Sequence, residues 1–557
     1  MKETALLRQL RRLCHGSQEA VQNGSGLNEL DKYLHVERPI EKTIKESLDK
    51  IREINGGMIL LVGSAGDGKS HMISTLKKEY DDFHFLNDAT EGCSPSMTAV
   101  DTLKYAMEEF SDDRIENTSE KLFVAINYGK LLDFIEDSDI KVNFRELTSC
   151  VEEMKPITES ENKRIIIISL SHLQSFELNL ESTNKPVDSY FMNSVLDKIV
   201  AKSKDNKFYL AYLEDKQKQG LFSLDAIDPI QLNFEILSEK AVRDSIVQMI
   251  IEAIIRYDLI VTPRDFLDFI YSIIVFPRWK DFNESKDFFQ AVLPSLIYNS
   301  SNNKIQKALT FLDPLKISSY EHDRELSFLF SLQEYNDNLI TQGKIDLCPD
   351  LSSSLKNILQ KFIANNNKYK VDISGLILRL QHLFCYHSES KAYIEFLKCL
   401  QGYYKEDSMY YEVMDGLVKN VIPRHYGSYY SDSDLIPLNI QGRKYKIFAR
   451  LSMPTADFQP SFDSTQPFIF DKSIKLNYDF RSGDPIELVM DFHLYEHLHE
   501  LSEGKLATSY EGERNLNFSN FVRVISGFSD AAQEVIIIDN ENNRTRLSFK
   551  YKKLQMN

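Results

Sequence analysis

The sequence has few cysteines and a single tryptophan. Its six cysteines, at positions 14, 93, 150, 348, 385 and 399, are scattered through 557 residues and never form a C-x-x-C pair. This scatter argues against a zinc ribbon and against a disulfide framework. It is typical of a protein that works in a reducing compartment.

The chain also lacks a long apolar run. Its most apolar stretch, residues 249–261, is interrupted by Glu252, Arg256 and Asp258. A membrane-spanning helix needs about 20 predominantly apolar residues. The first residues have no apolar segment of the kind found in a signal peptide. We therefore expect a soluble, cytoplasmic protein with no membrane partner.

A third shortage is positive charge, because the formal net charge is −17. Such an acidic chain would repel nucleic-acid phosphates overall, although a local basic surface or a basic partner stays open. Hydrophobic residues make up 42% of the chain, including 34 Phe and 27 Tyr, so large cores can form. The length predicts three or four domains.

One motif stands out from this background. Five apolar residues, Met58 to Val62, run directly into a G-x-x-x-x-G-K-S sequence that consists of Gly63, Ser64, Ala65, Gly66, Asp67, Gly68, Lys69 and Ser70. The apolar run predicts a buried parallel strand, and Met72, Ile73 and Leu76 predict a helix after the loop. A glycine turn without a ligand is the alternative.

A loop of this kind binds phosphate through its backbone. Its glycines let the N–H groups point inward, and the helix that follows adds the positive end of its dipole. Lys69 is expected to reach the β- and γ-phosphates, and the Ser70 hydroxyl to ligate Mg²⁺. We predict an ATP–Mg²⁺ site that includes residues 63–70 and His71.

Strand-like and helical patterns alternate after the loop. Strands are predicted at 83–86, 122–126 and 164–168, with helices between them, which indicates a doubly wound parallel α/β sheet of the P-loop NTPase, AAA-like kind. Helical patterns then follow, and strands return near the C-terminus. The predicted parts are an N-terminal helical segment (1–55), the ATPase domain (56–225), a helical lid (226–330), a helical domain (331–430) and a C-terminal α+β domain (431–557).

The rest of an ATP site can be assigned only in outline. Asp88 and Glu91 follow a predicted strand and are candidates to direct the metal or the attacking water, with Asp88 as the metal ligand. A polar loop at the sheet edge is the alternative. Asn127 closes another strand, either as a polar residue that senses the γ-phosphate or as a strand cap. Arg264 follows the helix start Thr262-Pro263 and is either a second sensor or a surface arginine.

Two other patterns are weaker. His493, Glu496 and His497 match the H-x-x-E-H zinc motif, but no third ligand stands out, so a structural helix is the preferred interpretation. At 544–552, basic residues alternate with Leu547, Phe549 and Tyr551. A strand there would carry cations on one face, either to contact phosphate or a partner, or to protect a sheet edge. We find no nuclease motif.

Several segments together resemble the DptF (DndF) family. These are Tyr33-Leu-His-Val-Glu-Arg-Pro-Ile-Glu41, the loop through His71, Leu86-Asn-Asp-Ala-Thr-Glu91, Ala125-Ile-Asn-Tyr-Gly129 and Thr262-Pro-Arg-Asp265. The resemblance covers the N-terminal helices, the ATPase layer and the lid, and it is weak over 430–557.

DptF is the ATPase-like subunit of the DNA phosphorothioation-dependent restriction system. The resemblance therefore implies a bacterial antiviral defence role with DptG-like and DptH-like subunits, in a complex that damages DNA lacking phosphorothioate. DNA would be reached through the complex, with the C-terminal basic strand as a candidate for direct contact. Two alternatives are a nucleotide-dependent switch or scaffold that does not hydrolyse ATP, and a motor that acts on DNA directly.

Overall fold

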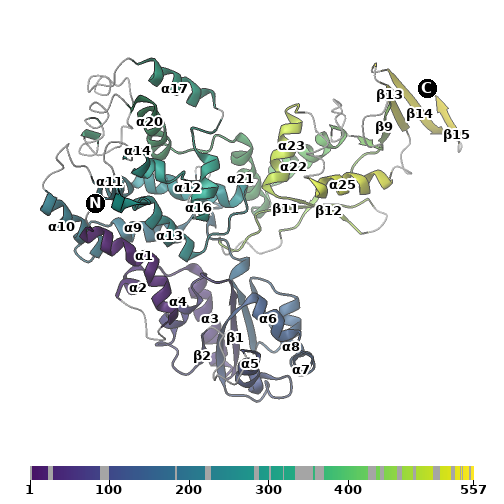
Figure 1. Cartoon of the computed structure of the whole chain (residues 1–557). Coiled ribbons are helices and arrows are strands. Elements are labelled where there is room, and N and C mark those ends of the chain that lie inside the picture. Colours follow the sequence, from purple (N-terminus) through teal and green to yellow (C-terminus); the bar gives the residue numbers. More distant parts are fainter. Residues whose placement is uncertain are drawn as a thin grey trace. The chain divides into compact units, whose positions relative to one another are not determined.

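The fold is that of a computed structural model of the whole chain (Figure 1). The residues that it describes are 3–22, 29–87, 99–181, 185–219, 228–281, 288–299, 303–317, 319–332, 356–357, 360, 369–424, 434–438, 445–460, 467–480, 484–505, 515–528, 534–539, 541, 543–550 and 553–556. The backbone packs into two compact units. The first comprises residues 1–177 and 188–387, and the second comprises 178–187 and 388–557.

A five-stranded sheet lies at the centre of the first unit's α/β part. Its order is β2-β3-β1-β5-β4, formed by β2 (His84–Leu86), β3 (Lys121–Asn127), β1 (Gly57–Gly63), β5 (Ile165–Ser169) and β4 (Ile157–Glu159). The first four run parallel, which confirms the strands predicted on either side of the P-loop strand. The edge strand β4 was not predicted and pairs antiparallel with β5.

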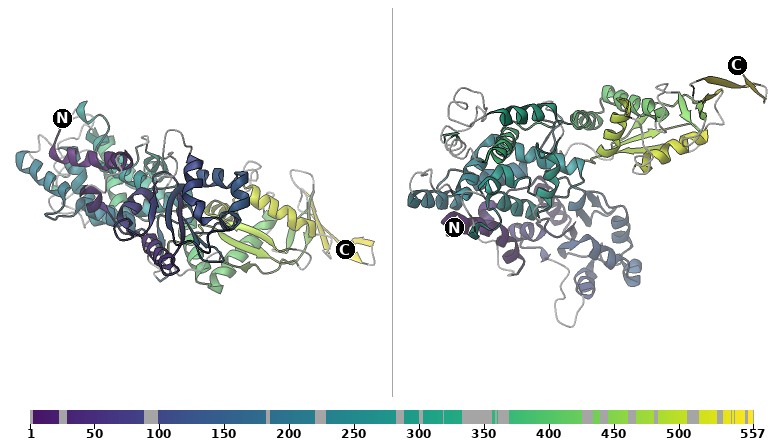
Figure 2. Two further views of the ribbon diagram at one scale, coloured as in Figure 1. Left: turned by 90° about the horizontal axis from the view of Figure 1, so that it is seen from below. Right: turned by 45° about the horizontal axis from the view of Figure 1, so that its top comes forward.

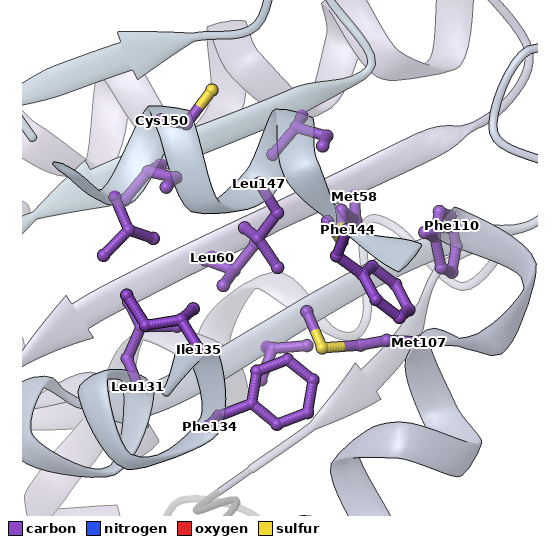
Figure 3. Close-up of a cluster of buried hydrophobic side chains, with 14 of the residues drawn as sticks. Met58, Leu60, Met107, Phe110, Leu131, Phe134, Ile135, Phe144, Leu147 and Cys150 are labelled. Atoms are coloured by element: carbon purple, nitrogen blue, oxygen red, sulfur yellow. The ribbon is translucent and has the colours of Figure 1, made fainter. Parts of the chain in front are cut away.

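Both faces of this sheet are covered, as an apolar central strand requires. Met58 and Leu60 of β1 contribute to a core on one face (Figure 3). Phe134 from α6 (Tyr128–Ile135), Leu147 from α8 (Arg145–Glu152) and Phe144 just before α8 belong to the same core. Ile59 and Leu61 alternate to the opposite face and are also fully buried. Helix α3 (Pro39–Glu53) contacts β1, and helix α4 (Lys69–Leu76) contacts β3. The domain is therefore a mixed α/β layer around a mostly parallel sheet.

The helices of the first unit form around this layer and in a helical region after it. Their bounds are α1 (Ala5–Gln22), α2 (Glu29–Leu34), α3 (Pro39–Glu53), α4 (Lys69–Leu76), α5 (Ala99–Met107), α6 (Tyr128–Ile135), α7 (Ser138–Asn143), α8 (Arg145–Glu152), α9 (Tyr190–Val200), α10 (Lys207–Gln219), α11 (Pro229–Ser238), α12 (Lys240–Arg256), α13 (Pro263–Ile274), α14 (Phe288–Ala291), α15 (Leu293–Leu296), α16 (Lys304–Leu309), α17 (Tyr320–Ser331) and α20 (Lys370–Phe384). Within the described residues, no helix combines the length and apolarity needed to cross a membrane.

The start of α13 follows the predicted pattern. The Thr262 hydroxyl accepts a hydrogen bond from the Asp265 N–H (3.2 Å), and the Asp265 carboxylate accepts one from the Thr262 N–H (3.0 Å), which is a reciprocal capping box. Phe266, Phe269 and Ile270 are fully buried along one face. The same helix lies beside α1 in Figure 1, and the two are in contact. The N-terminus of α13 is thereby fixed in place.

The second unit is α+β, as predicted for its C-terminal part. It holds α21 (Lys391–Tyr404), α22 (Ser408–Val421), α23 (Phe492–Ser502) and α25 (Leu516–Ser526), together with a three-stranded sheet of β10 (Asp457–Phe458), β11 (Ile474–Tyr478) and β12 (Ile486–Met490). Helix α25 lies along β12, where both views show the yellow-green helix against the sheet (Figure 2). The H-x-x-E-H residues lie on α23, where His497 is buried.

A second sheet contains the basic C-terminal strand. Its order is β15-β14-β13-β9-β8, from β15 (Lys553–Met556), β14 (Arg544–Lys550), β13 (Glu534–Asp539), β9 (Tyr445–Arg450) and β8 (Leu435–Pro437). Arg544 and Arg546 are exposed, whereas Leu547 is half-buried, so the predicted alternation is confirmed there. Arg546 lies 4.0 Å from the Glu534 carboxylate. The side chains of residues 549–552 lie outside the described set.

Candidate functional site

The G-x-x-x-x-G-K-S segment forms a closed loop between β1 and α4. The Lys69 ammonium folds back over this loop and donates hydrogen bonds to the backbone oxygens of Gly63 (3.0 Å) and Ser64 (2.7 Å). It also donates to the Asn127 Oδ1 atom at 3.0 Å. Because Asn127 pairs with Gly63 in the parallel register of β3 and β1, the two strand ends bring lysine and amide together.

Two glycines adopt backbone conformations that other residues rarely adopt. Gly66 has φ +92° and Gly68 has φ +85°, both in the left-handed region. Gly68 is the residue that immediately precedes the first turn of α4. A side chain at either position would therefore strain the loop, and the backbone N–H groups around it would lose their arrangement.

The Asp67 side chain forms a hydrogen bond within the same loop. Its carboxylate Oδ2 accepts a hydrogen bond from the Ser64 N–H at 2.5 Å. It also lies against Gly63, since a Cβ built there would be 2.7 Å from Oδ2. Burial raises the pKa of Asp67, while the Ser64 N–H and the charge of Lys69 act in the opposite direction. The carboxylate therefore lies beside the first two residues of the loop, Gly63 and Ser64.

A cavity of about 400 Å³ opens over the loop, within the size range of small-molecule sites. Four cationic side chains are found among the described residues that line it: Arg12, Arg38, Lys69 and Arg264. They come from α1, the start of α3, the loop itself and α13. Three carboxylates, those of Asp31, Glu41 and Asp67, line it as well, so the cationic side chains outnumber the acidic ones by one. On a chain of net charge −17, this local excess of positive charge favours an anionic ligand.

Away from the glycine loop, part of the cavity lining is apolar. It includes Leu13, Leu34, Val36, Phe191 and Val195, from α1, α2, the segment after α2, and α9. Helix α1 is held in place because the Asp215 carboxylate accepts hydrogen bonds from the N–H groups of Ala5 (2.9 Å) and Leu6 (2.7 Å). The cavity thus joins a partly apolar recess to the glycine loop that carries Lys69.

The segment before α3 contacts the loop and α4 at two points. Arg38 donates from Nη2 to the Asp67 carbonyl oxygen at 3.0 Å. His35 Nδ1 lies 2.9 Å from His71 Nε2. Burial, with the charges of His35 and Arg38, lowers the pKa of His71 to about 4, so this imidazole is neutral at pH 7. Burial also raises the pKa of Glu41, which is only 3% exposed.

Helix α13 contacts the glycine loop at Gly66. A Cβ built on Gly66 would lie 3.0 Å from the Thr262 Oγ1 atom and 3.5 Å from the Arg264 Cβ. Arg264 is exposed and lines the cavity. Two helix N-termini, those of α4 and α13, therefore lie at one loop, and each presents the positive end of its dipole there.

The structure brings together several of the predicted site residues. Residues 64–71, Asn127 and Arg264 line one cavity, and Gly63 accepts a hydrogen bond from Lys69 at its edge. Asp88 and Glu91, the candidates for directing metal and water, lie outside the described residues. Within the described set, no group of three or more His, Cys, Asp or Glu side chains is arranged to hold a metal ion.

Sequence reasoning missed the contribution of the segment around Arg38 and of helix α9. The only local signal for Arg38 was its place just before Pro39, at a predicted helix start. Phe191 and Val195 gave no signal, because they lie more than a hundred residues beyond the loop and belong to an ordinary amphipathic helix. Comparisons with protein-family models, curated proteins and solved structures found no match for this chain.

Proposed function

We propose that this chain binds and hydrolyses ATP as a P-loop NTPase with an AAA-like domain and a helical lid. The observation that carries the proposal is the arrangement of Lys69 and the glycine loop at the end of β1, beneath a cavity of about 400 Å³. A nucleotide needs an anion site and an apolar recess for its base, and the cavity supplies both. The phosphates belong over the loop and the base between α1, α2 and α9.

The side chains at the loop suit a Mg²⁺-nucleotide. Mg²⁺ prefers oxygen ligands and is commonly held by few protein groups together with the phosphates. The Ser70 hydroxyl, in the first turn of α4, is the described candidate, and Asp88 is the proposed acidic partner. The metal would neutralise charge that develops on the phosphates. Lys69 is placed to share that task.

Hydrolysis requires groups that act on the γ-phosphate and on the attacking water. Asn127 is adjacent to Lys69 and is the proposed orienting residue for that water. Arg264 lies at the N-terminus of α13, against the loop, and is the proposed sensor of the γ-phosphate. Because α13 belongs to the helical region, loss of the γ-phosphate would release the lid from the loop.

The wider role that we propose rests on the resemblance to the DptF family. In this role the chain is the ATPase subunit of a cytoplasmic anti-phage restriction complex that acts on DNA lacking phosphorothioate. Its partners would be DptG-like and DptH-like subunits. DNA would be contacted chiefly through the complex, with the exposed Arg544 and Arg546 as a further contact.

A second function is favoured by the carboxylates that line the cavity. Two of them are already engaged by backbone N–H groups, Asp67 with Ser64 and Glu41 with Arg38. If neither Asp88 nor Glu91 reaches the metal, the site would bind ATP without turning it over. The chain would then be a nucleotide-dependent switch or an assembly scaffold.

The test is steady-state ATP hydrolysis by the purified chain, alone and with duplex DNA, with Lys69→Ala as the control. Turnover that the substitution abolishes supports the ATPase, and stimulation by DNA places the chain on the nucleic acid. Stoichiometric ATP binding without turnover, also in the full complex, selects the switch. In cells, Lys69→Ala should abolish restriction of unmodified DNA, and undiminished restriction would refute the proposed role.

A further inference from the structure

Arg38 contacts the phosphate loop from outside the motif. Its Nη2 atom donates hydrogen bonds to the Asp67 carbonyl oxygen (3.0 Å) and to the Met72 sulfur (3.2 Å). It also packs against Gly68, because a Cβ built there would lie 3.3 Å from the same nitrogen. One guanidinium therefore contacts the loop, the glycine that precedes α4, and α4 itself.

The bond to the Asp67 carbonyl has a consequence for the next residue. In a trans peptide, the C=O of one residue and the N–H of the following residue point in opposite directions across one rigid plane. The described chain contains no cis peptide. Arg38 holds the Asp67 oxygen on its own side, so the Gly68 N–H points away from Arg38. Because Gly68 has φ +85°, the glycine tolerates this orientation without a side-chain clash.

We propose that Arg38 is a positioning residue that aims the Gly68 N–H at the β-phosphate of the bound nucleotide. This inference rests on the proposed nucleotide site. Arg38 does not itself need to contact the phosphate, since it acts through the Asp67–Gly68 peptide. A charge-assisted hydrogen bond to the carbonyl also polarises the peptide, which makes its N–H a stronger donor.

Arg38 is well placed for this task because its own position is fixed. It is the residue before α3, and its N–H donates to the Glu41 Oε1 atom at 3.2 Å, while the Glu41 N–H donates to the Arg38 carbonyl at 2.8 Å. Pro39 restricts the backbone at the first position of the helix. The contact between His35 and His71 ties the same segment to α4 a second time.

The chemistry of this contact favours arginine over lysine. The Arg38 side chain is only 19% exposed, and its closest carboxylate atom in an ion pair, Glu41 Oε1, is 3.9 Å from Nε. Burial lowers the pKa of Arg38, although arginine remains charged. Burying a cation costs free energy unless the cation is hydrogen-bonded, and the Asp67 carbonyl oxygen provides that hydrogen bond. Lysine would keep the charge, but its ammonium turns freely on a flexible stem, whereas the planar guanidinium holds the two Nη2 hydrogens in fixed directions.

The experiment measures the affinities of the full chain for AMP, ADP and ATP with Mg²⁺ by calorimetry, for wild type, Arg38→Met and Arg38→Lys. For Arg38→Met we expect about a tenfold loss of affinity for ADP and for ATP, the size of one hydrogen bond to a charged group, and no change for AMP. Arg38→Lys should lose less, again only for ADP and ATP. If Arg38→Met does not fold, the affinities of Arg38→Lys test the inference in its place.

The matched control is Arg164→Met. Arg164 also donates to backbone oxygens, those of Gly56 (3.0 Å) and Thr118 (3.3 Å), but at the opposite end of β1. This variant should lower the melting temperature and leave the three affinities unchanged.

Three results would contradict the inference. If the Arg38 variants bind ADP with wild-type affinity, the inference about Arg38 is wrong, but the proposed function stands. An equal loss of affinity for AMP, ADP and ATP would also contradict the inference, because it would indicate a distorted cavity. Absence of nucleotide binding by the wild-type chain would overturn the proposed function as well.

Discussion

Lys69, the first residue of α4, and Asn127, the last residue of β3, meet through a hydrogen bond of 3.0 Å from Nζ to Oδ1. The parallel register aligns Gly63 with Asn127, so the last residue of β3 stands directly beside the first residue of the phosphate loop. Asn127 precedes α6 without capping it through its side chain. Its amide is therefore directed to the lysine and not to the helix that it precedes.

Substitution of Asn127 by alanine should separate hydrolysis from binding. We expect turnover to fall about 100-fold, as when one fixed polar group is removed from a reacting phosphate or carbonyl site. ATP affinity should stay near the wild-type value, because Lys69 keeps its two backbone oxygen partners. Single-turnover kinetics and calorimetry measure the two quantities. Asn162→Ala is the control, since Asn162 is bonded to Glu146 away from the cavity.

The capping box of α13 gives a prediction about stability. Thr262→Ala removes the acceptor for the Asp265 N–H and should lower the free energy of unfolding by about 1 kcal/mol. Thr262→Ser keeps the hydroxyl and should restore most of the loss. Chemical denaturation of the three proteins measures the effect. Equal unfolding midpoints for Thr262→Ala and wild type would show that the cap contributes nothing.

A buried ion pair in the helical region gives a larger effect. Arg379 donates hydrogen bonds to both carboxylate oxygens of Asp313, at 3.0 and 2.6 Å. Asp313 is only 1% exposed, and the Arg379 guanidinium lies over the Tyr298 ring. Arg379→Met leaves the carboxylate buried without its cation and should cost about 3–5 kcal/mol.

The comparison for Arg379→Met is Arg114→Met. Arg114 pairs with Glu108 and Glu109 at the surface, where the cost should stay below about 1 kcal/mol. Urea denaturation measures both variants. A cost for Arg379→Met no larger than that for Arg114→Met would contradict the assignment of a buried pair.

The pH dependence of stability should reflect His71. Its pKa in the folded chain is lowered to about 4, mainly by burial, from an ordinary value of 6.5. Between these values the unfolded chain binds a proton that the folded chain does not, so His71 makes stability fall as pH decreases from about 6.5 to 4. His71→Gln should flatten that slope relative to wild type. The exposed His84, replaced by Gln, is the control, and an unchanged slope in His71→Gln would argue against a buried neutral imidazole.

Local patterns made part of this fold predictable. Strand β1 was predicted from the apolar run before Gly63, and helix α13 from the spacing of Phe266, Phe269 and Ile270. Each pattern lies within one element, and both elements are found. Asn127 was predicted as a site residue because it is a polar residue that closes an apolar strand. The contact between Arg38 and the Asp67 carbonyl was not predictable, because it depends on how the segment before α3 packs against the loop. The strand β4 has only three residues, too few to show a period.

The most direct measurement for the central claim is a calorimetric titration of the full chain with Mg²⁺–ATP, repeated with Lys69→Ala. Lys69 lies at the phosphate loop, bonded to Gly63, Ser64 and Asn127. We predict one saturable site in the wild-type chain and a loss of affinity of about tenfold or more in the variant, because a charged partner of the phosphates is removed. No binding by the wild-type chain, or equal affinities in both proteins, would contradict a nucleotide site at this loop.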